Sequence, residues 1–471
     1  MAIPKRYVWS PGRHPARNGR LQAPCRSKTE IPARRSVTEQ RRGLAVQRRR
    51  TEVVAATLAA GLLATTLTAC GGEDTQGGGG ELHVVAVEHG DRSGNSSKRY
   101  WDKLVGEFQF TSPDIDVKVE IVDRDRVDRK VAEMVEAGEA PDLALTGGSF
   151  AGYAEEGELY SADEVLSTAV QGDFVSSLAQ AGTVRRIQYG LPFVASTTAL
   201  FYNKDLFAEA GIKDAPTTWE ELRKDAAELR SAGVKTPYGL PLGPADAEAE
   251  TLNWMLGGGG GYSDDGGAYD IDSPQNTQTF EWLRDKLVKP GLTQPDPAAT
   301  SRDLAYADFM DGDVAMLNGQ PTLMQRALES GVDYGIAPLP GRSGPAKSTT
   351  GVADWMTAFK QGGHQEQIRT FLDFLYQRKH VVEYADQYDL LPVTTSASQA
   401  MRDDDAHEPL WEFLDRLPTA TLYPVGKTSW TPTARALRKS VGTAVAEDGD
   451  PAEVLGEIQR SATATEVAGG S

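Results

Sequence analysis

Cysteine is nearly absent from this chain of 471 residues, which contains only Cys25 and Cys70. At most one disulfide is possible, so the fold cannot rest on a disulfide framework. Long apolar runs are also scarce. The uncharged run Val53–Leu67 has about fifteen residues, too few to cross a hydrocarbon layer of roughly 30 Å. Stability therefore has to come from a large apolar core, for which the chain is long enough.

The N-terminal region has the features of a removable targeting segment. Arg48–Arg50 precede the run Val53–Leu67, and Leu67-Thr68-Ala69 places small residues directly before Cys70. This order resembles a lipobox, in which the cysteine is diacylated and becomes the first residue of the mature protein. We therefore expect residues 1–69 to be a signal peptide and Cys70 to carry the lipid, since two acyl chains suffice for stable anchoring. Export by Sec and by Tat both stay open.

The predicted signal peptide is unusually long. Residues 1–36 are rich in Arg and Pro and exceed what a signal sequence needs, which favours a misassigned start codon. Residues 1–69 hold 14 Lys and Arg against 3 Glu, a net charge of +11, while the whole chain carries −18, so the remainder carries −29. An acidic mature domain argues against a nucleic acid partner, because phosphate backbones are bound by basic patches.

Residues 70–80 are rich in glycine and suit a flexible tether. After the tether, strands are expected at Leu82–Val87, Asp116–Val122 and Pro141–Leu145, with helices at Tyr100–Phe108 and Arg126–Glu139 between them. Strand and helix in alternation predict an α/β fold with a parallel sheet. Ligands bind beyond the C-terminal ends of such strands, so the loops Glu88–Ser97 and Thr146–Ser149 are the first candidate sites.

Several later segments resemble, in order, those of the extracellular solute-binding proteins that serve sugar ABC transporters. The segments are Gly190–Phe193 through Phe207 with Thr218-Trp219, Phe309–Met316, Ile336–Pro340, Phe371–Leu375 and Leu390–Val393. The resemblance covers nearly everything after Glu81. It implies two lobes with mainly parallel sheets, joined by crossing hinge strands, that trap a solute between them when they close.

The resemblance also implies how the chain is divided. The first crossing is expected at Leu191–Ser196, a return crossing at Leu317–Gln320 and a third at Thr350–Trp355. The N-terminal lobe then comprises residues 81–195 and 317–352, and the C-terminal lobe residues 196–316 and 353–471. The expected partners are a saccharide, a permease pair with its ATPase, and the membrane through the lipid anchor. The protein is expected to act as a monomer, without a cofactor.

Saccharide sites combine stacking aromatic rings with carboxylate, amide and Arg groups. Trp355 is expected to be an exposed aromatic on the third crossing, and Trp430 matches a segment where related proteins place a stacking ring. Four other tryptophans, Trp101, Trp219, Trp282 and Trp411, are expected in the core. The candidate ligand-binding residues are Asp91, Arg92, Gly148, Ser149, Ser196, Thr197, Asn253, Trp254, Asn318, Gln320, Asp354, Trp355 and Trp430.

The chain departs from the maltodextrin-binding branch of that family at several positions. Gly148 and Ser149 replace an acid and an arginine, Ser196 replaces an acid, and no tryptophan follows Asn318-Gly319. Maltodextrin itself is therefore a doubtful ligand. Ser196, Thr197, Asn318 and Gln320 could still hydrogen-bond another sugar.

Catalytic and metal-binding patterns fail on residue identity. Thr421 stands where a P-loop ending in Gly426-Lys427-Thr428 needs glycine, and no Gly-x-Ser-x-Gly elbow occurs. The histidines lack zinc-site spacing, and Asp264–Asp272 lacks the ligand order of a calcium loop. An enzyme is therefore not expected.

Two alternatives stay open. A surface-anchored glycoside hydrolase or lyase needs only two carboxylates, whose pairing in space leaves no mark in the sequence. A binding protein for a non-sugar solute is the other, such as a polyamine, peptide or phosphate ester. Glu88, Asp91 and Asp354 could supply carboxylates for a polyamine.

Overall fold

The computed structural model describes residues 80–90 and 93–469. These residues belong to one compact unit, which contains two lobes, each built on its own β-sheet with helices around it. The predicted two-lobed α/β fold is confirmed. The predicted signal peptide, Cys70, the tether up to residue 79, and Asp91 and Arg92 lie outside the described residues.

The first lobe is built on a six-stranded sheet in the order β12-β11-β3-β1-β2, with β6 also paired to β11. The apolar run Leu82–Val87 lies in β1, which pairs in parallel with β2 and β3, as the alternation of strands and helices predicts. The strands are β1 (Gly80–Val87), β2 (Ile115–Val122), β3 (Leu143–Thr146), β6 (Leu191–Thr197), β11 (Thr350–Ala358) and β12 (Thr421–Leu422). A short hairpin, β4 (Thr183–Val184) and β5 (Ile187–Gln188), precedes β6.

The second lobe is built on a four-stranded sheet in the order β10-β7-β9-β8. Its strands are β7 (Ala199–Asn203), β8 (Thr236–Gly239), β9 (Val314–Gly319) and β10 (Tyr334–Ala337). β7 runs antiparallel to β9 and β10, as β11 does to β3 and β6 in the first lobe. Both sheets are thus mixed. Three of the five strand pairings in the first sheet are parallel, as predicted, whereas two of the three pairings in the second sheet are antiparallel.

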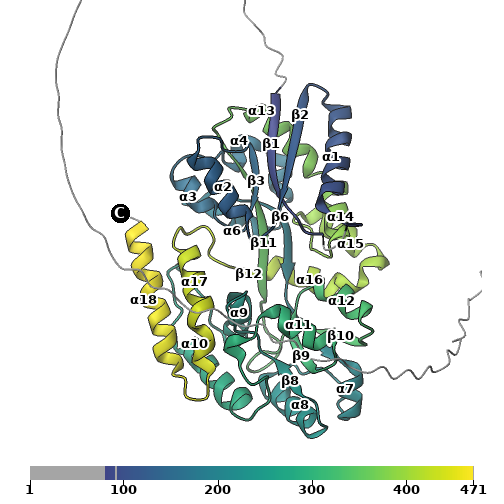
Figure 1. Ribbon diagram of the computed structural model, residues 1–471, viewed down its shortest axis with the longest axis vertical. Helices are drawn as coiled ribbons and strands as arrows, with labels where there is room; N and C mark the ends of the chain where they lie inside the picture. The colour runs from purple at the N-terminus through teal and green to yellow at the C-terminus, as the bar shows by residue number, and fades with distance from the viewer. Residues whose placement is uncertain (1–79, 91–92, 470–471) are drawn as a thin grey trace, which may run out of the picture. The chain divides into compact units, whose positions relative to one another are not determined.

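The two crossing strands, β6 and β11, pair antiparallel from Thr197 opposite Gly351 to Leu191 opposite Met356. Figure 1 shows them side by side down the middle of the view. β6 leads through Thr198 into β7 and β11 returns to the first sheet, so the crossings predicted at Leu191–Ser196 and Thr350–Trp355 are confirmed. The crossing predicted at Leu317–Gln320 is wrong, because β9 stays in the second sheet between β7 and β8.

Helices cover both sheets where apolar residues recur at helical spacing. In α1, for example, Tyr100, Trp101, Leu104 and Phe108 are all buried. The first-lobe helices are α1 (Ser97–Thr111), α2 (Val127–Glu136), α3 (Phe150–Glu155), α4 (Ala162–Val165), α5 (Thr168–Asp173), α6 (Ser176–Ala181), α13 (Gln365–Leu375) and α14 (Arg378–Gln387). α15 (Thr395–Arg402) packs on α14, and α16 (Trp411–Arg416) packs on β6. The second-lobe helices are α7 (Lys204–Glu209), α8 (Trp219–Ser231), α9 (Ala247–Gly258), α10 (Pro274–Trp282), α11 (Arg302–Met310), α12 (Thr322–Glu329), α17 (Trp430–Ser440) and α18 (Pro451–Gly469).

The sheets divide the chain differently from the predicted lobe boundaries. The prediction places residues 317–352 in the first lobe, whereas β9 and β10 pair within the second sheet. It places residues 353–471 in the second lobe, whereas β11 continues to Ala358 in the first sheet and α13 packs on α1 and β1. Of that segment, α17 and α18 do pack on the second-lobe helices α9 and α10. The error follows from the misplaced return crossing, since the chain returns through β11 and not through β9.

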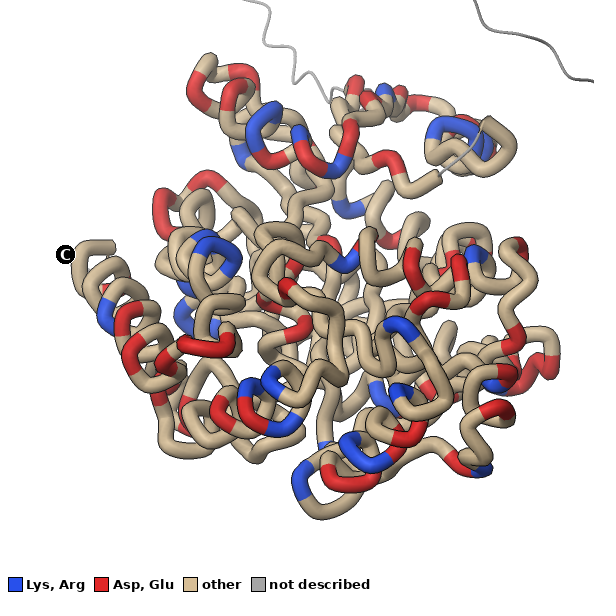
Figure 2. The backbone as a smooth tube through the Cα atoms, turned by 60° about the horizontal axis from the view of Figure 1, so that its bottom comes forward, with Lys and Arg blue, Asp and Glu red and all other residues tan. Residues whose placement is uncertain are grey.

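Acidic residues outnumber basic ones over the whole chain, with 67 Asp and Glu against 49 Lys and Arg. Figure 2 shows both signs dispersed over the helices of the described residues. Within residues 80–90 and 93–469, no helix has the length and apolarity that a membrane span needs.

The placement of α13 in the first lobe can be tested through its aromatic contacts with α1. Phe108 and Phe371 are fully buried, with ring centroids 5.0 Å apart in an edge-to-face arrangement. We expect Phe108→Leu and Phe371→Leu each to lower the free energy of unfolding by on the order of 1 kcal/mol. A double-mutant cycle should show a coupling of about 0.5–1.5 kcal/mol, measured by urea denaturation.

Phe110→Leu on the same helix is the control, because Phe110 is 91% exposed. Additive single effects at Phe108 and Phe371 would contradict this packing.

Candidate functional site

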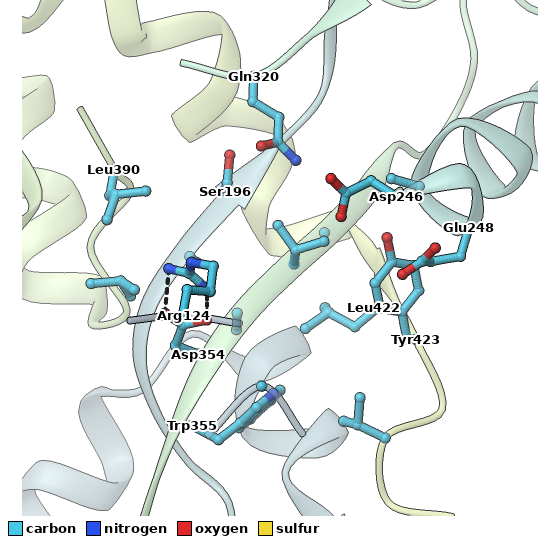
Figure 3. A pocket seen from close by; sticks show the side chains of 18 of the residues that line it. Arg124, Ser196, Asp246, Glu248, Gln320, Asp354, Trp355, Leu390, Leu422 and Tyr423 are labelled. Carbon is cyan, nitrogen blue, oxygen red and sulfur yellow. Dashed lines mark hydrogen bonds and ion pairs between the residues drawn. The ribbon is translucent and has the colours of Figure 1, made fainter. Parts of the chain in front are cut away.

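A cleft of about 470 Å³ lies beside the crossing strands, with residues of both lobes in its walls. This volume falls in the usual range for small-molecule sites, about 300–1,000 Å³. His89, Arg124 and Gly147 follow the C-terminal ends of β1, β2 and β3, the edge where parallel sheets bind ligands. The second lobe contributes the starts of α9, α11 and α12, which Figure 3 shows in part across from Arg124.

A network of charged and aromatic side chains is centred on Asp354 of β11. Both carboxylate oxygens of Asp354 accept from Arg124, at 2.7 and 2.8 Å, in a two-point contact visible in Figure 3. The Nε2 atom of His89 lies 2.8 Å from Oδ2 of Asp354, and its Nδ1 lies 2.7 Å from the hydroxyl of Tyr384 on α14. Because an ionised carboxylate only accepts, Nε2 donates to Asp354, and in the neutral imidazole Nδ1 then accepts from the Tyr384 hydroxyl.

This network keeps Asp354 ionised although it is buried. Burial disfavours the charged form, but the positive charge of Arg124 and the hydrogen bond from His89 outweigh it, so the pKa of Asp354 lies well below its ordinary value. Asp354 in turn raises the pKa of Arg124. The side chain of Arg124 is 55% exposed, so this fixed guanidinium also faces the cleft.

The second lobe places two more Arg–carboxylate pairs at the cleft, around the start of α9. Arg438 of α17 donates to both oxygens of Glu248, through Nε at 3.0 and 2.9 Å. Arg302, the first residue of α11, lies 3.0 Å from Asp246 and 3.4 Å from the side-chain oxygen of Gln320. Asp246 adopts a left-handed backbone with φ of 61°, which turns the chain into α9.

An aromatic wall closes the cleft where the chain passes from β12 to α17. Tyr423 is half-buried and stacks on Trp430, with centroids 5.1 Å apart and ring planes 24° apart. Tyr262 supports Trp430 from a centroid distance of 5.3 Å. Burial raises the pKa of Tyr423, so its hydroxyl stays protonated and can both donate and accept. The wall thus offers a ring face beside charged hydrogen-bonding groups.

A second buried carboxylate, Glu250 of α9, lies beneath the cleft without a cationic partner among the described residues. It accepts from Trp254 Nε1 at 2.7 Å, Asn318 Nδ2 at 3.0 Å and the Tyr238 hydroxyl at 3.2 Å. Burial raises the pKa of Glu250 to about 7, even though these three donors favour the ionised form.

The structure brings five of the predicted site residues to the cleft: Ser196, Gln320, Asp354, Trp355 and Trp430. Two of the five differ from their predicted roles. Trp355 is only 1% exposed, because its ring packs on Phe150 beside Gly190. Trp430 is buried behind Tyr423, which presents the more exposed ring.

Six other predicted site residues do not line this cleft. Thr197 donates to the Phe413 carbonyl, Asn253 accepts from the Thr350 amide, and Trp254 packs between Trp219 and Trp282 in the second-lobe core. Asn318 binds Glu250, Ser149 binds Asp128, and Gly148 lies against Val425. Gly148, Ser149, Thr197 and Asn318 lie at or near strand ends, whereas Asn253 and Trp254 lie within α9, and all six contact neighbours within the fold. Asp91 and Arg92 lie outside the described residues.

Sequence reasoning missed most of the charged and aromatic lining. The strand-end rule was applied after the first and third strands, and the same rule after Val122 would have indicated Arg124 and Asp128. The second-lobe residues and Tyr423 meet only through tertiary packing, so no local signal marks them. The missed lining residues are His89, Arg124, Asp128, Asp246, Glu248, Arg302, Tyr388, Tyr423 and Arg438.

Within residues 80–90 and 93–469, no group of three or more His, Cys, Asp or Glu side chains is positioned to hold a metal ion. The cleft instead pairs its carboxylates with arginines and backbone amides. Such a surface suits binding of an organic solute through hydrogen bonds.

Comparisons with known proteins agree with this geometry. A family profile described as bacterial extracellular solute-binding protein matches residues 94–382. A protein from Brucella abortus (strain 2308) named only as a binding protein is 27% identical over 391 residues, covering 82% of this chain and 93% of the relative. The sn-glycerol-3-phosphate-binding periplasmic protein UgpB of the same strain is 27% identical over 253 residues, 48% of this chain and 56% of its own length.

Solved structures share the fold at low sequence identity. The cyclic alpha-maltosyl-1,6-maltose binding protein from Arthrobacter globiformis superposes with a TM-score of 0.72 at 19% identity, covering 82% of this chain and 99% of the other. The sugar-binding protein MalE from Xanthomonas citri gives a TM-score of 0.69 at 18% identity, covering 83% and 98%.

The buried carboxylate of Glu250 predicts a pH dependence of stability. An unfolded Glu titrates near about 4.3, whereas Glu250 in the fold titrates near about 7. Between these values the unfolded chain has released the proton and the folded chain has kept it. The free energy of unfolding should therefore fall by on the order of 3 kcal/mol as the pH rises from about 4.3 to 7, and not further above 7.

Glu250→Gln removes the titrating carboxylate, so we expect the free energy of unfolding of the variant to lack this fall with pH. The difference between wild type and variant, measured by urea denaturation at pH 5 and pH 7.5, should shift in favour of the variant at the higher pH. Glu457→Gln, at an exposed position of α18, is the matched control. A wild-type minus variant difference that stays constant with pH would rule out a buried, proton-holding Glu250.

Proposed function

This chain belongs to the bacterial extracellular solute-binding protein family, and from that premise we propose that its cleft captures a saccharide for import. Members of the family bind solutes outside the cytoplasm for ABC transporters and do not transform them. The chain is therefore a solute-binding protein and not an enzyme. The saccharide, the lipid anchor and the transporter partners are the parts that we propose.

One observation carries the saccharide proposal: the cleft sets a partly exposed ring face beside charge-assisted hydrogen-bonding groups from both lobes. Tyr423 offers the ring, while Arg124 and Gln320 offer donors and acceptors across the cleft (Figure 3). Sugars have apolar C–H faces and rims of hydroxyl groups, which match these two kinds of surface.

The ligand names of similar proteins support the same class of solute. The Arthrobacter globiformis and Xanthomonas citri proteins are named for binding sugars, and UgpB for binding glycerol-3-phosphate. The first two solutes are saccharides, whereas glycerol-3-phosphate is a phosphate ester, so the support for a saccharide comes from the two sugar receptors. We therefore assign this chain a mono- or oligosaccharide.

We further propose that Cys70 is diacylated after removal of residues 1–69, and that the tether at residues 70–80 lets the two lobes move above the membrane. A monomer held in this way would meet its permease pair and ATPase at high effective concentration. Closure around the solute would present both lobes to the permease together.

A binding screen tests the saccharide. The purified protein is heated with a panel of mono- and oligosaccharides, with peptides and polyamines as controls, because a solute at 100 times its Kd adds about 2.7 kcal/mol. We expect a rise in Tm with one sugar series. Tyr423→Ala should weaken binding roughly 10-fold, while Tyr423→Phe keeps the stacking and most of the affinity.

Phe110→Ala, which removes an exposed aromatic ring from α1 at a position that does not line the cleft, should leave sugar binding unchanged. A Tm rise with peptides or polyamines alone would refute the saccharide. A sugar response that survives Tyr423→Ala at full strength would refute the role of the ring.

The anchor has an independent test. We expect the wild-type protein to fractionate with membranes and to incorporate labelled palmitate, whereas Cys70→Ala should be unlabelled and appear in the soluble fraction. Cys25→Ala is the matched control and should behave as wild type. Equal labelling of the Cys70→Ala protein would disprove lipidation at this residue.

A further inference from the structure

Every arginine that lines the cleft among the described residues is already paired with a carboxylate of the protein. Arg124 is held by Asp354 and Arg438 by Glu248, each through contacts to both carboxylate oxygens, and Arg302 lies 3.0 Å from Asp246. A phosphate or carboxylate group of a solute would have to compete with these internal partners. Within residues 80–90 and 93–469, the cleft therefore offers guanidinium donors whose positive charges are each compensated by a carboxylate.

The first-lobe wall carries two further carboxylates that have no basic partner among the described residues. Glu88, after β1, accepts from the backbone amides of Gly90 and Ser97 through one oxygen, at 2.8 and 2.7 Å. Asp128, in the first turn of α2, accepts from the Gly147 amide and the Ser149 hydroxyl, both at 3.2 Å.

These amides occupy positions where a solute anion would otherwise bind. Ser97 begins α1, and Gly147 directly follows the C-terminal end of β3. Helix starts and strand-end loops of this kind bind anions through free N–H groups. Here the protein's own Glu88 and Asp128 already accept from these amides, so neither of the two places is free for an external anion.

The start of α9 repeats the arrangement in the second lobe. Asp246 precedes the helix and Glu248 is its second residue, so carboxylates again occupy the positive end of the helix dipole. α12 and α17 also begin at the cleft, at Thr322 and Trp430, without an acidic residue in the first turn. The exclusion of anions therefore rests on the first-lobe wall and the α9 corner.

Oδ1 of Asp128 accepts the hydrogen bonds from Gly147 and Ser149, and its Oδ2 accepts none from the part of the chain that the structure describes. Its side chain is exposed to the cleft, and partial desolvation there raises its pKa. A hydroxyl or ammonium group of a solute can donate to this oxygen, whereas a phosphate oxygen is repelled.

We propose that the cleft selects a hydroxyl-rich solute that is uncharged or carries an amine, that it rejects phosphate esters and sugar acids, and that Asp128 is a specificity-determining residue for this choice. The inference rests on the proposed saccharide-binding function and narrows its ligand class. It predicts that this chain does not bind a phosphate ester, the class of ligand named for UgpB.

Sets of solutes that match in structure but differ in charge test this selectivity by isothermal titration calorimetry. The probes are glucose, glucosamine, glucuronate and glucose 6-phosphate, then maltose and maltose 1-phosphate, then glycerol and glycerol 3-phosphate, with spermidine and inorganic phosphate alone. We expect each anionic member to bind at least about 30-fold more weakly than its uncharged analogue. Inorganic phosphate should give no saturable binding.

Asp128→Asn keeps the shape of the side chain and removes its charge. It should therefore reduce the difference in affinity between uncharged and anionic solutes by roughly 10-fold. Asp163→Asn, at the exposed position of α4 in the same lobe, should leave this difference in affinity unchanged. A difference in affinity that Asp128→Asn does not alter would overturn the role of Asp128.

The remaining outcomes distinguish a failure of this inference from a failure of the proposed saccharide-binding function. An anionic sugar that binds as tightly as its uncharged analogue, or saturable binding of phosphate, would overturn the charge selection and leave a saccharide receptor in place. Binding of spermidine alone, or no binding across all sets and the wider sugar panel, would overturn the saccharide receptor and this inference with it.

Discussion

The buried carboxylate of Asp354 is the constraint around which the cleft is arranged. A charge buried on a crossing strand has to be compensated, because an unpaired one would cost several kcal/mol. Its partners are Arg124 after β2 and His89 after β1, with Tyr384 of α14 behind the histidine. The interactions of this one carboxylate thus hold two strand ends and a helix next to the crossing strands and position the first-lobe wall of the cleft.

The two lobes treat a buried carboxylate in different ways. In the first lobe Asp354 stays ionised beside Arg124, with its pKa held below the ordinary range. In the second lobe Glu250 has only neutral donors, and burial raises its pKa to about 7. Asp354 therefore gives the cleft a fixed charged group, whereas Glu250 ties α9 to β9 through Asn318 without adding a fixed charge near neutral pH.

More of the fold than of the site could be predicted from the sequence. The strand at Leu82–Val87 and the helix at Tyr100–Phe108 carry local apolar periodicity, and the family segments indicated two lobes. The lobe boundaries were not predictable locally, because they depend on whether β9 or β11 returns to the first sheet, and both are apolar strands. The site prediction found Asp354, which lies on the crossing strand β11, and Gln320, which follows β9 of the second sheet. It missed Arg438 and Tyr423, which reach the cleft only through the packing of α17.

Native mass spectrometry of the protein purified directly from its own cells tests the central claim most directly, since it identifies the solute that the cleft retains. The account predicts an added mass equal to a whole number of sugar units, without phosphorus, that is lost from Tyr423→Ala. A retained phosphate ester, peptide or polyamine in the wild-type protein would contradict it.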